Sequence, residues 1–232
     1  SGLHLGDAVL LWTQGRGTYA QYVAVPVSAV VRKPAELSFA EAAALPHAGL
    51  AAWNMLVDQA RVRAGQTVLV LGGAGGVGSA AVQIAVASGA HVTATTSAHN
   101  LDYVRGLGAA TVIDYTTQHF EDQVRNVDIA IDTVDLDNAY RALAVVRRGG
   151  VLVSTVGVPE PAQCQARGVT CLRRSLGGTP VRAVLKQLTD WTLVHRFRVN
   201  VDRSFDLAQV GAAWHYSQSG HVRGKIVIRI GD

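Results

Sequence analysis

The chain has 232 residues, of which 49% are hydrophobic and 16% are charged, and its formal net charge at pH 7 is +4. This composition excludes a disordered chain and provides for one sizeable core, or for one core with a partial second domain. The basic residues form small groups without interleaved aromatic side chains, so we expect solvated surface charge and no nucleic-acid binding.

The first residues predict short strands. We expect one strand over 8–12 and another over 19–25, separated by a glycine-containing turn. The alternating pattern of the second strand predicts that Tyr19 and Tyr22 pack against neighbours and do not act as proton donors. Residues 1–4 have neither the basic nor the apolar region of a signal peptide.

A helical segment begins at Ser38. Glu41 follows this serine by three residues, which is the spacing of a capping box. Apolar positions continue to Val57, but Pro46 and Gly49 interrupt them. Because a proline inside a helix removes a hydrogen bond and clashes with the preceding turn, we expect two helices here.

From residue 67 onward, short β-type runs alternate with helical patterns, which predicts a parallel, doubly wound α/β sheet that binds its ligand beyond the carboxyl ends of the strands. The absence of charge between Arg63 and Asp102 is explained by buried parallel strands and a crossover helix, so we expect no membrane span. Strands are expected over 67–71, 91–96, 111–113, 127–131, 151–155, 168–172, 197–201 and 225–230, and helices over 79–88, 100–107, 136–146, 181–191 and 206–217.

The turn after residue 71 carries a dinucleotide-binding fingerprint. Gly73, Gly75 and Gly78 fit the spacing G-x-G-x-x-G, in which one glycine makes the tight turn, one admits the pyrophosphate and one lets the helix pack closely on the strand. Strand, turn, helix and second strand follow in the required order within about 30 residues. We therefore expect a dinucleotide site and hydride-transfer chemistry, with a purely structural glycine turn as the alternative.

The end of the second of these strands favours NADPH over NADH. An NAD-specific fold places an acidic residue about 20 residues after the glycines, but residues 93–101 contain no Asp or Glu. Ser97, His99 and Asn100 can donate hydrogen bonds to a 2′-phosphate. The alternative is that these three residues form an ordinary solvated loop.

The cysteines, His47 and two aspartates are interpreted as structural residues and not as catalytic or metal-binding ones. Cys164 and Cys171 do not make a disulfide framework or a zinc lobe, so we expect inert cysteines in a reduced, cytoplasmic protein. His47 lacks the partner ligands that catalytic zinc needs, so no metal is expected. Asp132 and Asp135 are interpreted as a strand end and a helix N-cap, although they could suggest a carboxylate pair.

Six segments in order along the chain then carry a family resemblance: 17–26 (GTYAQYVAVP), 42–46 (AAALP), 49–53 (GLAAW), 74–78 (AGGVG), 112–115 (VIDY) and 221–227 (HVRGKIV). They resemble the medium-chain dehydrogenase/reductase superfamily, in its zinc-independent quinone oxidoreductase and enoyl reductase-like branch. The resemblance implies a doubly wound Rossmann sheet with remnants of a β-rich GroES-like catalytic domain. It implies a dinucleotide-binding domain over 45–197 and a partial catalytic domain over 1–44 and 198–232.

The same resemblance implies hydride transfer from NADPH to a small molecule, either a quinone or an alkene conjugated to a carbonyl. The usual N-terminal strands of the catalytic domain are lacking, and the remnants leave open sheet edges. We therefore expect a fragment, a homodimer, or a chain that a partner segment completes. The alternative is a non-catalytic NADPH-binding module or subunit with an incomplete active site.

Site residues are carried over by position, and no catalytic residue is identified. Ala51 stands where the family often has a hydroxyl residue near the nicotinamide ribose. The resemblance places the dinucleotide on Gly73, Ala74, Gly75, Gly76, Val77 and Gly78, its adenosine phosphate near Ser97, His99 and Asn100, the adenine near Tyr115, the nicotinamide beside Thr133, Val134, Val156 and Gly157, and His47 in the substrate cleft.

Overall fold

The structure is a computed structural model that describes residues 2–13, 17–175 and 180–231. The chain forms two compact units: Ser1–Leu50 with Gly178–Asp232, and Ala51–Gly177. These bounds differ from the domain limits expected from the sequence, because the helix that begins at Val181 belongs to the first unit. The division of the chain into a cofactor domain and a catalytic domain stays a prediction.

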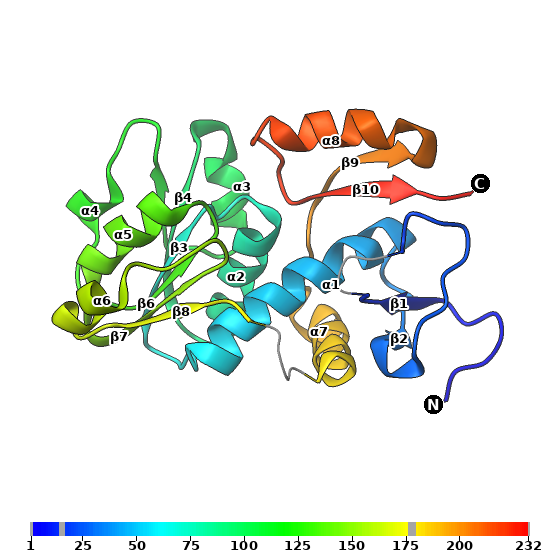
Figure 1. Ribbon diagram of the computed structural model, residues 1–232, viewed down its shortest axis with the longest axis horizontal. Coiled ribbons are helices and arrows are strands. Elements are labelled where there is room, and N and C mark those ends of the chain that lie inside the picture. Colours follow the sequence, from blue (N-terminus) through cyan, green and yellow to red (C-terminus); the bar gives the residue numbers. More distant parts are fainter. Residues whose placement is uncertain (1, 14–16, 176–179, 232) are drawn as a thin grey trace. The chain divides into compact units, whose positions relative to one another are not determined.

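The second unit contains a six-stranded parallel sheet with the strand order β5-β4-β3-β6-β7-β8 (Figure 1). The first strand of the unit lies in mid-sheet and the strand order reverses beside it, so a topological switch point lies between β3 and β6. This arrangement confirms the predicted doubly wound sheet. The strands are β3 (Thr67–Leu71), β4 (His91–Thr96), β5 (Thr111–Asp114), β6 (Val127–Asp132), β7 (Val146–Ser154) and β8 (Thr170–Arg173).

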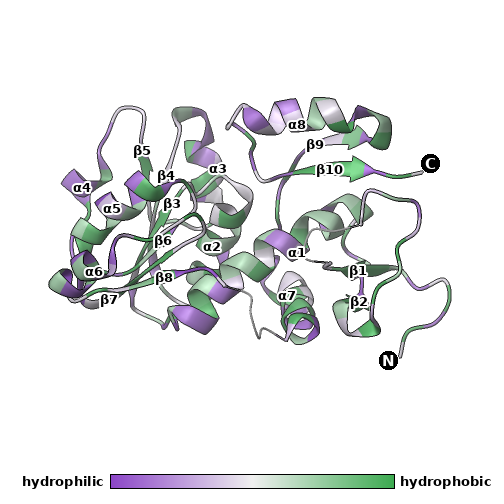
Figure 2. Ribbon diagram, in the orientation of Figure 1, coloured by the Kyte–Doolittle hydropathy of each residue, from purple (hydrophilic) through white to green (hydrophobic). Residues whose placement is uncertain are grey.

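Helices cover the sheet because its central strand β3 is apolar on both faces, and Figure 2 shows this strand in green. Residues 68–71 of β3 are each at most 1% exposed, which a strand achieves only when both faces are covered. Helix α2 packs on β3 and β4, and α5 packs on β6 and β7. The helices of this unit are α2 (Gly76–Ala87), α3 (Leu101–Gly106), α4 (Phe120–Gln123), α5 (Leu136–Val145) and α6 (Pro161–Arg167).

Strand β7 begins five residues earlier than the sequence predicts. Gly149 and Gly150, which follow the helix predicted over 136–146, lie inside the strand, where the register with β6 shifts. A Cβ on Gly150 would lie 2.6 Å from a methyl of Val146 and 2.8 Å from the carbonyl oxygen of Asp128. The glycine is therefore needed for close approach at a strand irregularity.

The expectation of inert, reduced cysteines is wrong for this structure, because Cys164 and Cys171 form a disulfide. Helix α6 ends at Gly168, whose left-handed φ of 65° turns the chain back into β8. This reversal brings the helix and the edge strand side by side, with the Cα atoms of the two cysteines 6.1 Å apart. The bridge was missed because its spacing gives no sign of the reversal.

The first unit has two small sheets. Strand β1 (Val9–Leu11) pairs antiparallel with β2 (Val30–Arg32), and β9 (Val201–Asp206) pairs parallel with β10 (Lys225–Arg229). Helix α8 (Val210–Gln218) packs on the second pair as its crossover, and α7 (Val181–His195) packs on β2 and on the 3₁₀ turn η1 (Val27–Ala29).

The strand predicted over residues 19–25 is absent from the described part of the first unit. Its side chains alternate suitably, but no strand pairs with them there, and β2 forms a few residues later instead. Tyr19 is 57% exposed and Tyr22 is 91% exposed, so the packing expected for these two tyrosines is wrong. Alternation alone does not make a strand when the ladder partner is missing.

The two helices expected around Pro46 are one helix, α1 (Phe39–Trp53), which continues into a π-helical turn, η2 (Asn54–Gln59). The capping box at its start is confirmed, because the Ser38 amide donates to the Glu41 carboxylate and the Glu41 amide donates to the Ser38 hydroxyl. Leu45, Ala48 and Leu50 are at most 1% exposed. Burial of these neighbours outweighs the local penalty of the proline.

Candidate functional site

The glycine-rich turn joins β3 to α2 at the carboxyl edge of the parallel sheet. Gly72 has a φ of 79°, a conformation that favours glycine. Gly75 is the N-cap of α2 and, without a side chain, makes no capping hydrogen bond to the first turn of the helix. That turn contains no acidic residue. The amides and the dipole of this helix are therefore set to receive an anion such as a phosphate.

The three fingerprint glycines differ in what surrounds them. A Cβ on Gly78 would lie 2.0 Å from the carbonyl oxygen of Gly72, so this position needs glycine for the helix to pack on the strand. A Cβ on Gly73 would press on the Ala94 side chain at 3.0 Å. At Gly75 the nearest atom would be the Gly72 oxygen, at 3.5 Å. Space is therefore open in front of Gly75, as a bound pyrophosphate would require.

The residues expected at the adenosine end lie together at the carboxyl ends of β4 and β5. The buried Asn100 side chain donates to the Ser97 hydroxyl at 3.4 Å, and that hydroxyl lies 3.5 Å from Nδ1 of the exposed His99. The Tyr115 amide donates to the Thr96 carbonyl at 3.0 Å, which holds this exposed tyrosine beside the end of β4. The structure thus gathers the predicted polar and aromatic contacts at one edge.

Thr133 lies at the switch point, immediately after β6. Its hydroxyl donates to the Leu71 carbonyl at 2.8 Å, so it ties the loop after β6 to the end of β3. A Cβ on Gly72 would meet the Thr133 hydroxyl at 2.8 Å and a methyl of Val134 at 3.0 Å. The loop after β6 and the glycine turn are therefore in close contact.

The exposed apolar side chains of the second unit all follow strand ends. Among its described residues, the exposed large hydrophobic side chains are those of Tyr115 (55%), Val134 (45%), Leu136 (41%) and Val156 (48%). They come directly after β5, β6 and β7. A Cβ on Gly157 would lie 3.4 Å from the Leu136 side chain, so Leu136 borders the predicted nicotinamide residues. Leu136 was not among the site residues expected from the sequence, because it begins a predicted helix.

Asp132 and Ser154 also lie at this edge, as the last residues of β6 and β7. Both side chains are 0% exposed, and the Ser154 hydroxyl donates to the Asp132 carboxylate at 2.7 Å. Burial raises the pKa of the Asp132 carboxyl above its usual value, against the lowering effect of its hydrogen bonds from Ser154 and Val134. The pairing was missed because it depends on which strands are neighbours. Asp135 is the N-cap of α5, as predicted, and accepts the Asn138 amide at 2.8 Å.

The remaining predicted residue, His47, lies in the first unit and is exposed on α1. Its place in a substrate cleft stays a prediction. Across residues 2–13, 17–175 and 180–231, no three His, Cys, Asp or Glu side chains gather into a group that could hold a metal ion. Nor does any helix in those ranges combine the length and the hydropathy needed to cross a bilayer.

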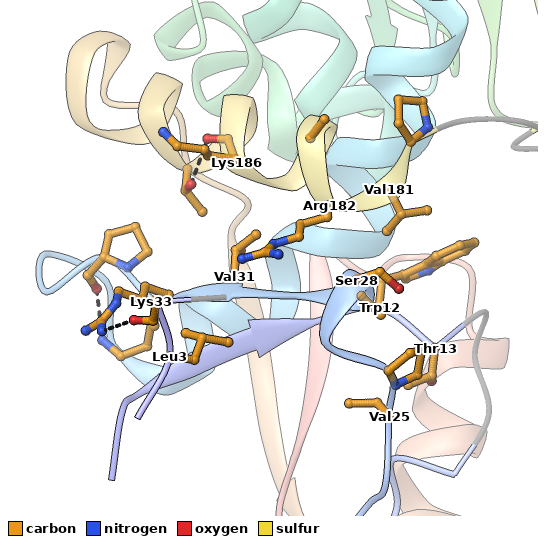
Figure 3. A pocket seen from close by; sticks show the side chains of 18 of the residues that line it. Leu3, Trp12, Thr13, Val25, Ser28, Val31, Lys33, Val181, Arg182 and Lys186 are labelled. Carbon is orange, nitrogen blue, oxygen red and sulfur yellow. Dashed lines mark hydrogen bonds between the residues drawn. The ribbon is translucent and has the colours of Figure 1, made fainter. Parts of the chain in front are cut away.

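The first unit contains a groove of about 1410 Å³ between α7 and the segment around β1 and β2 (Figure 3). Leu3, Trp12 and Val31 contribute apolar walls. Lys33 and Lys186 also line the groove, but the first donates to the Pro34 carbonyl at 3.0 Å and the second to Asp190 at 2.8 Å. None of the predicted cofactor residues lines this groove.

A parallel Rossmann sheet with an uncapped glycine turn at its switch point defines the second unit as a dinucleotide-binding fold. The family model described as zinc-binding dehydrogenase matches residues 107–228, and the model for the C-terminal domain of alanine dehydrogenase/PNT matches residues 46–153. The chain belongs to the zinc-binding dehydrogenase family, in the quinone oxidoreductase-like branch of the medium-chain dehydrogenase/reductase superfamily.

Among solved structures, an alcohol dehydrogenase superfamily protein from Novosphingobium aromaticivorans is 32% identical, with a TM-score of 0.92 over 100% of this chain and 77% of that chain. The quinone oxidoreductase from Coxiella burnetii is 29% identical, with a TM-score of 0.87 over 100% of this chain and 74% of that chain. These similarities confirm the predicted family and fold class.

Among curated proteins, the 2-methylene-furan-3-one reductase of Solanum lycopersicum is 37% identical over 91% of this chain and 52% of its own length. The chloroplastic NADPH-dependent alkenal/one oxidoreductase of Arabidopsis thaliana is 34% identical over 91% of this chain and 53% of its own length. The chain therefore spans about half the length of these relatives.

Proposed function

We propose that this chain carries the NADPH-binding part of an oxidoreductase that transfers hydride to a quinone or to an alkene conjugated to a carbonyl. The observation that carries this proposal is the open, uncapped turn at Gly75, which lies at the switch point of the sheet. The named activities of the relatives from Solanum lycopersicum, Arabidopsis thaliana and Coxiella burnetii support the reaction class.

The residues present fit NADPH. The pyrophosphate would lie on the turn 73–78, because the first amides of α2 lack a side-chain cap and space is open there. The 2′-phosphate would be received by Ser97, His99 and Asn100, since residues 93–101 provide donors and no repelling carboxylate. Tyr115 would cover the adenine with its exposed ring.

When bound, the nicotinamide of NADPH supplies the hydride. Thr133 and Gly157 would border the ring through the two loops, while Val134, Leu136 and Val156 would give it an apolar surface. Such a surface excludes water from one face of the ring and directs the other face toward the substrate. The anion that hydride transfer leaves on the substrate would take its proton from water or from a protein or ribose hydroxyl, and no catalytic residue is proposed.

We propose that the groove of the first unit is covered in the working enzyme by further polypeptide, of the same chain or of a partner. The groove is largely apolar, and the relatives extend well beyond the matched region. The alternative, a non-catalytic NADPH-binding module with an incomplete active site, is favoured by the same open groove. A homodimer and a cytoplasmic location stay predictions, and the disulfide would be unusual in a reducing cytoplasm.

We also propose that the chain works without zinc, although the family model is described as zinc-binding. Catalytic zinc needs three protein ligands, and the described residues contain no group of three His, Cys, Asp or Glu side chains that could hold the metal. Elemental analysis of protein purified without a metal-affinity tag is expected to find much less than one zinc per chain. About one zinc per chain that disappears in His47→Ala would contradict this proposal.

Calorimetric titration with NADPH, followed by NADPH oxidation assays with a panel of quinones and enones, tests the function. We expect saturable binding by the chain and oxidation once the groove is covered. Binding without oxidation in every complete form of the protein would favour the non-catalytic module. Failure to bind NADPH at all would contradict both functions.

A further inference from the structure

Two buried polar side chains at the cofactor edge take no part in the proposed contacts with NADPH. Asp132 ends β6 and Ser154 ends β7, and the two residues are partners in the parallel ladder. Both are 0% exposed, and the Ser154 hydroxyl donates to Oδ2 of Asp132 at 2.7 Å. A buried carboxylate is unfavourable unless its oxygens are well hydrogen-bonded, so this pair needs a reason beyond ending two strands.

The pair holds the backbone of two loops. Oδ1 of Asp132 accepts the Val134 amide at 3.0 Å, in the loop after β6. The Ser154 hydroxyl oxygen accepts the amides of Val156 and Gly157 at 3.2 and 3.3 Å, in the loop after β7. One hydrogen-bonded unit therefore connects the two loops that carry the exposed valines.

The chemistry of this unit requires a carboxylate. Because both carboxylate oxygens only accept, the Ser154 proton points to Asp132 and the two lone pairs of its oxygen remain for the amides of Val156 and Gly157. An asparagine in place of Asp132 would turn its NH₂ either toward the Val134 amide or toward the serine oxygen. In the first orientation, the NH₂ group and the Val134 amide are two donors that face each other. In the second, the NH₂ group and the amides of Val156 and Gly157 are three donors for the two lone pairs of the serine oxygen.

We propose that Asp132 and Ser154 are positioning residues, which fix the loops at 133–134 and 156–157 so that Val134 and Val156 receive the nicotinamide ring. This inference rests on the proposed function and deepens it, because it assigns the nicotinamide end of the site to a buried pair that touches no ligand. The pair acts on the ring through the loop backbones, and its hydrogen bonds described above run to Val134, Val156 and Gly157 and not to the glycine turn.

Binding of two ligands separates this role from a general structural one. NADPH and 2′-phospho-ADP-ribose, which lacks the nicotinamide ring, are titrated by calorimetry into the wild-type chain and into Asp132→Asn and Ser154→Ala. We expect each variant to weaken NADPH about tenfold, as for the loss of one ordering hydrogen bond, and to change the analogue less than about threefold. Both substitutions are small, and thermal melting identifies a variant that does not fold, in which case the other carries the test.

Ser88→Ala is the matched control. This variant also removes a serine hydroxyl that donates a hydrogen bond, here to the Ile84 carbonyl at 2.8 Å, but at the far end of α2. We expect no change in either affinity. Equal weakening of both ligands by the variants at Asp132 and Ser154, or no weakening at all, would overturn the positioning role. If the wild-type chain binds neither ligand, the proposed function fails, and the inference that rests on it fails too.

Discussion

The two units of the chain differ in how completely they bury their apolar residues. In the second unit, six parallel strands are covered by helices, and its exposed large hydrophobic side chains follow the strands at the predicted cofactor edge. In the first unit, which has two two-stranded sheets, a large groove lies between α7 and the segment around β1 and β2, and Leu5, Tyr22, Phe39 and Val194 are among its exposed apolar residues. The comparison teaches that the unit proposed to bind the cofactor buries its apolar residues more completely than the unit proposed to position the substrate.

The largest expected effect concerns the groove of the first unit. Covering it, by an upstream segment or a partner chain, should raise kcat/KM by orders of magnitude, because substrate positioning can contribute about 7 kcal/mol or more to lowering the barrier. NADPH affinity should change little, since the second unit carries all the predicted nucleotide contacts. Oxidation of NADPH, measured with and without the added polypeptide, checks this. Turnover of about 10 per second by the 232-residue chain alone would show that the open groove does not limit the reaction.

The second prediction asks whether the turn binds the dinucleotide. Gly75→Val should weaken NADPH binding at least about 100-fold, because the side chain would occupy the open space where the backbone is expected to meet the pyrophosphate. The fold should survive, since the space at Gly75 is open, whereas Gly78→Val should unfold the unit through contact with the Gly72 oxygen. Calorimetry and circular dichroism measure the two effects. A folded Gly75→Val variant with wild-type affinity for NADPH would show that the turn is not part of the cofactor site.

The third prediction concerns the adenosine end. NADPH should bind at least about tenfold more tightly than NADH, a difference of about 1.4 kcal/mol. The reason is that donors at Ser97, His99 and Asn100 stand where an NAD-specific fold places a carboxylate. Competitive titration with both cofactors checks this preference. Equal affinities would mean that these residues are only a solvated loop.

The smallest effect tests the stability of the second unit. Arg141 on α5 hydrogen-bonds Glu121 on α4 and thereby lowers the pKa of the Glu121 carboxyl from its usual value of 4.5. A lowered pKa contributes stability above the unfolded value, and this contribution is lost as the pH falls through the folded value. Glu121→Gln should therefore cost less than about 1 kcal/mol at pH 7 and nothing at strongly acid pH, because the pair is partly exposed. Urea unfolding at both pH values measures the difference.

Local patterns predicted the parts of the fold whose causes are local. Apolar β-type runs and the glycine spacing placed β3, α2 and β4 well, because a tight turn and close helix packing impose those residue types. The gathering of Ser97 and Tyr115 also followed, since parallel strands end at one edge. Predicting these regions required only the order of the elements along the chain.

Features that depend on neighbours in space were not predictable in the same way. The Asp132–Ser154 pair depends on β6 lying beside β7, and the disulfide depends on the reversal at Gly168. Pro46 lies inside a helix because burial outweighs its local preference. Each outcome was decided by tertiary packing, which residue periodicity does not report.

The disulfide between α6 and β8 has a consequence for how the sheet meets other molecules. Strand β8 is an outermost strand, and such strands fray first and offer unpaired amides to which a second chain can add. Cys164 is anchored in the core, so β8 cannot leave the sheet without pulling α6 with it. The oxidation state of the Cys164–Cys171 disulfide therefore governs how easily β8 detaches from the sheet and how easily another molecule pairs with the sheet at this edge.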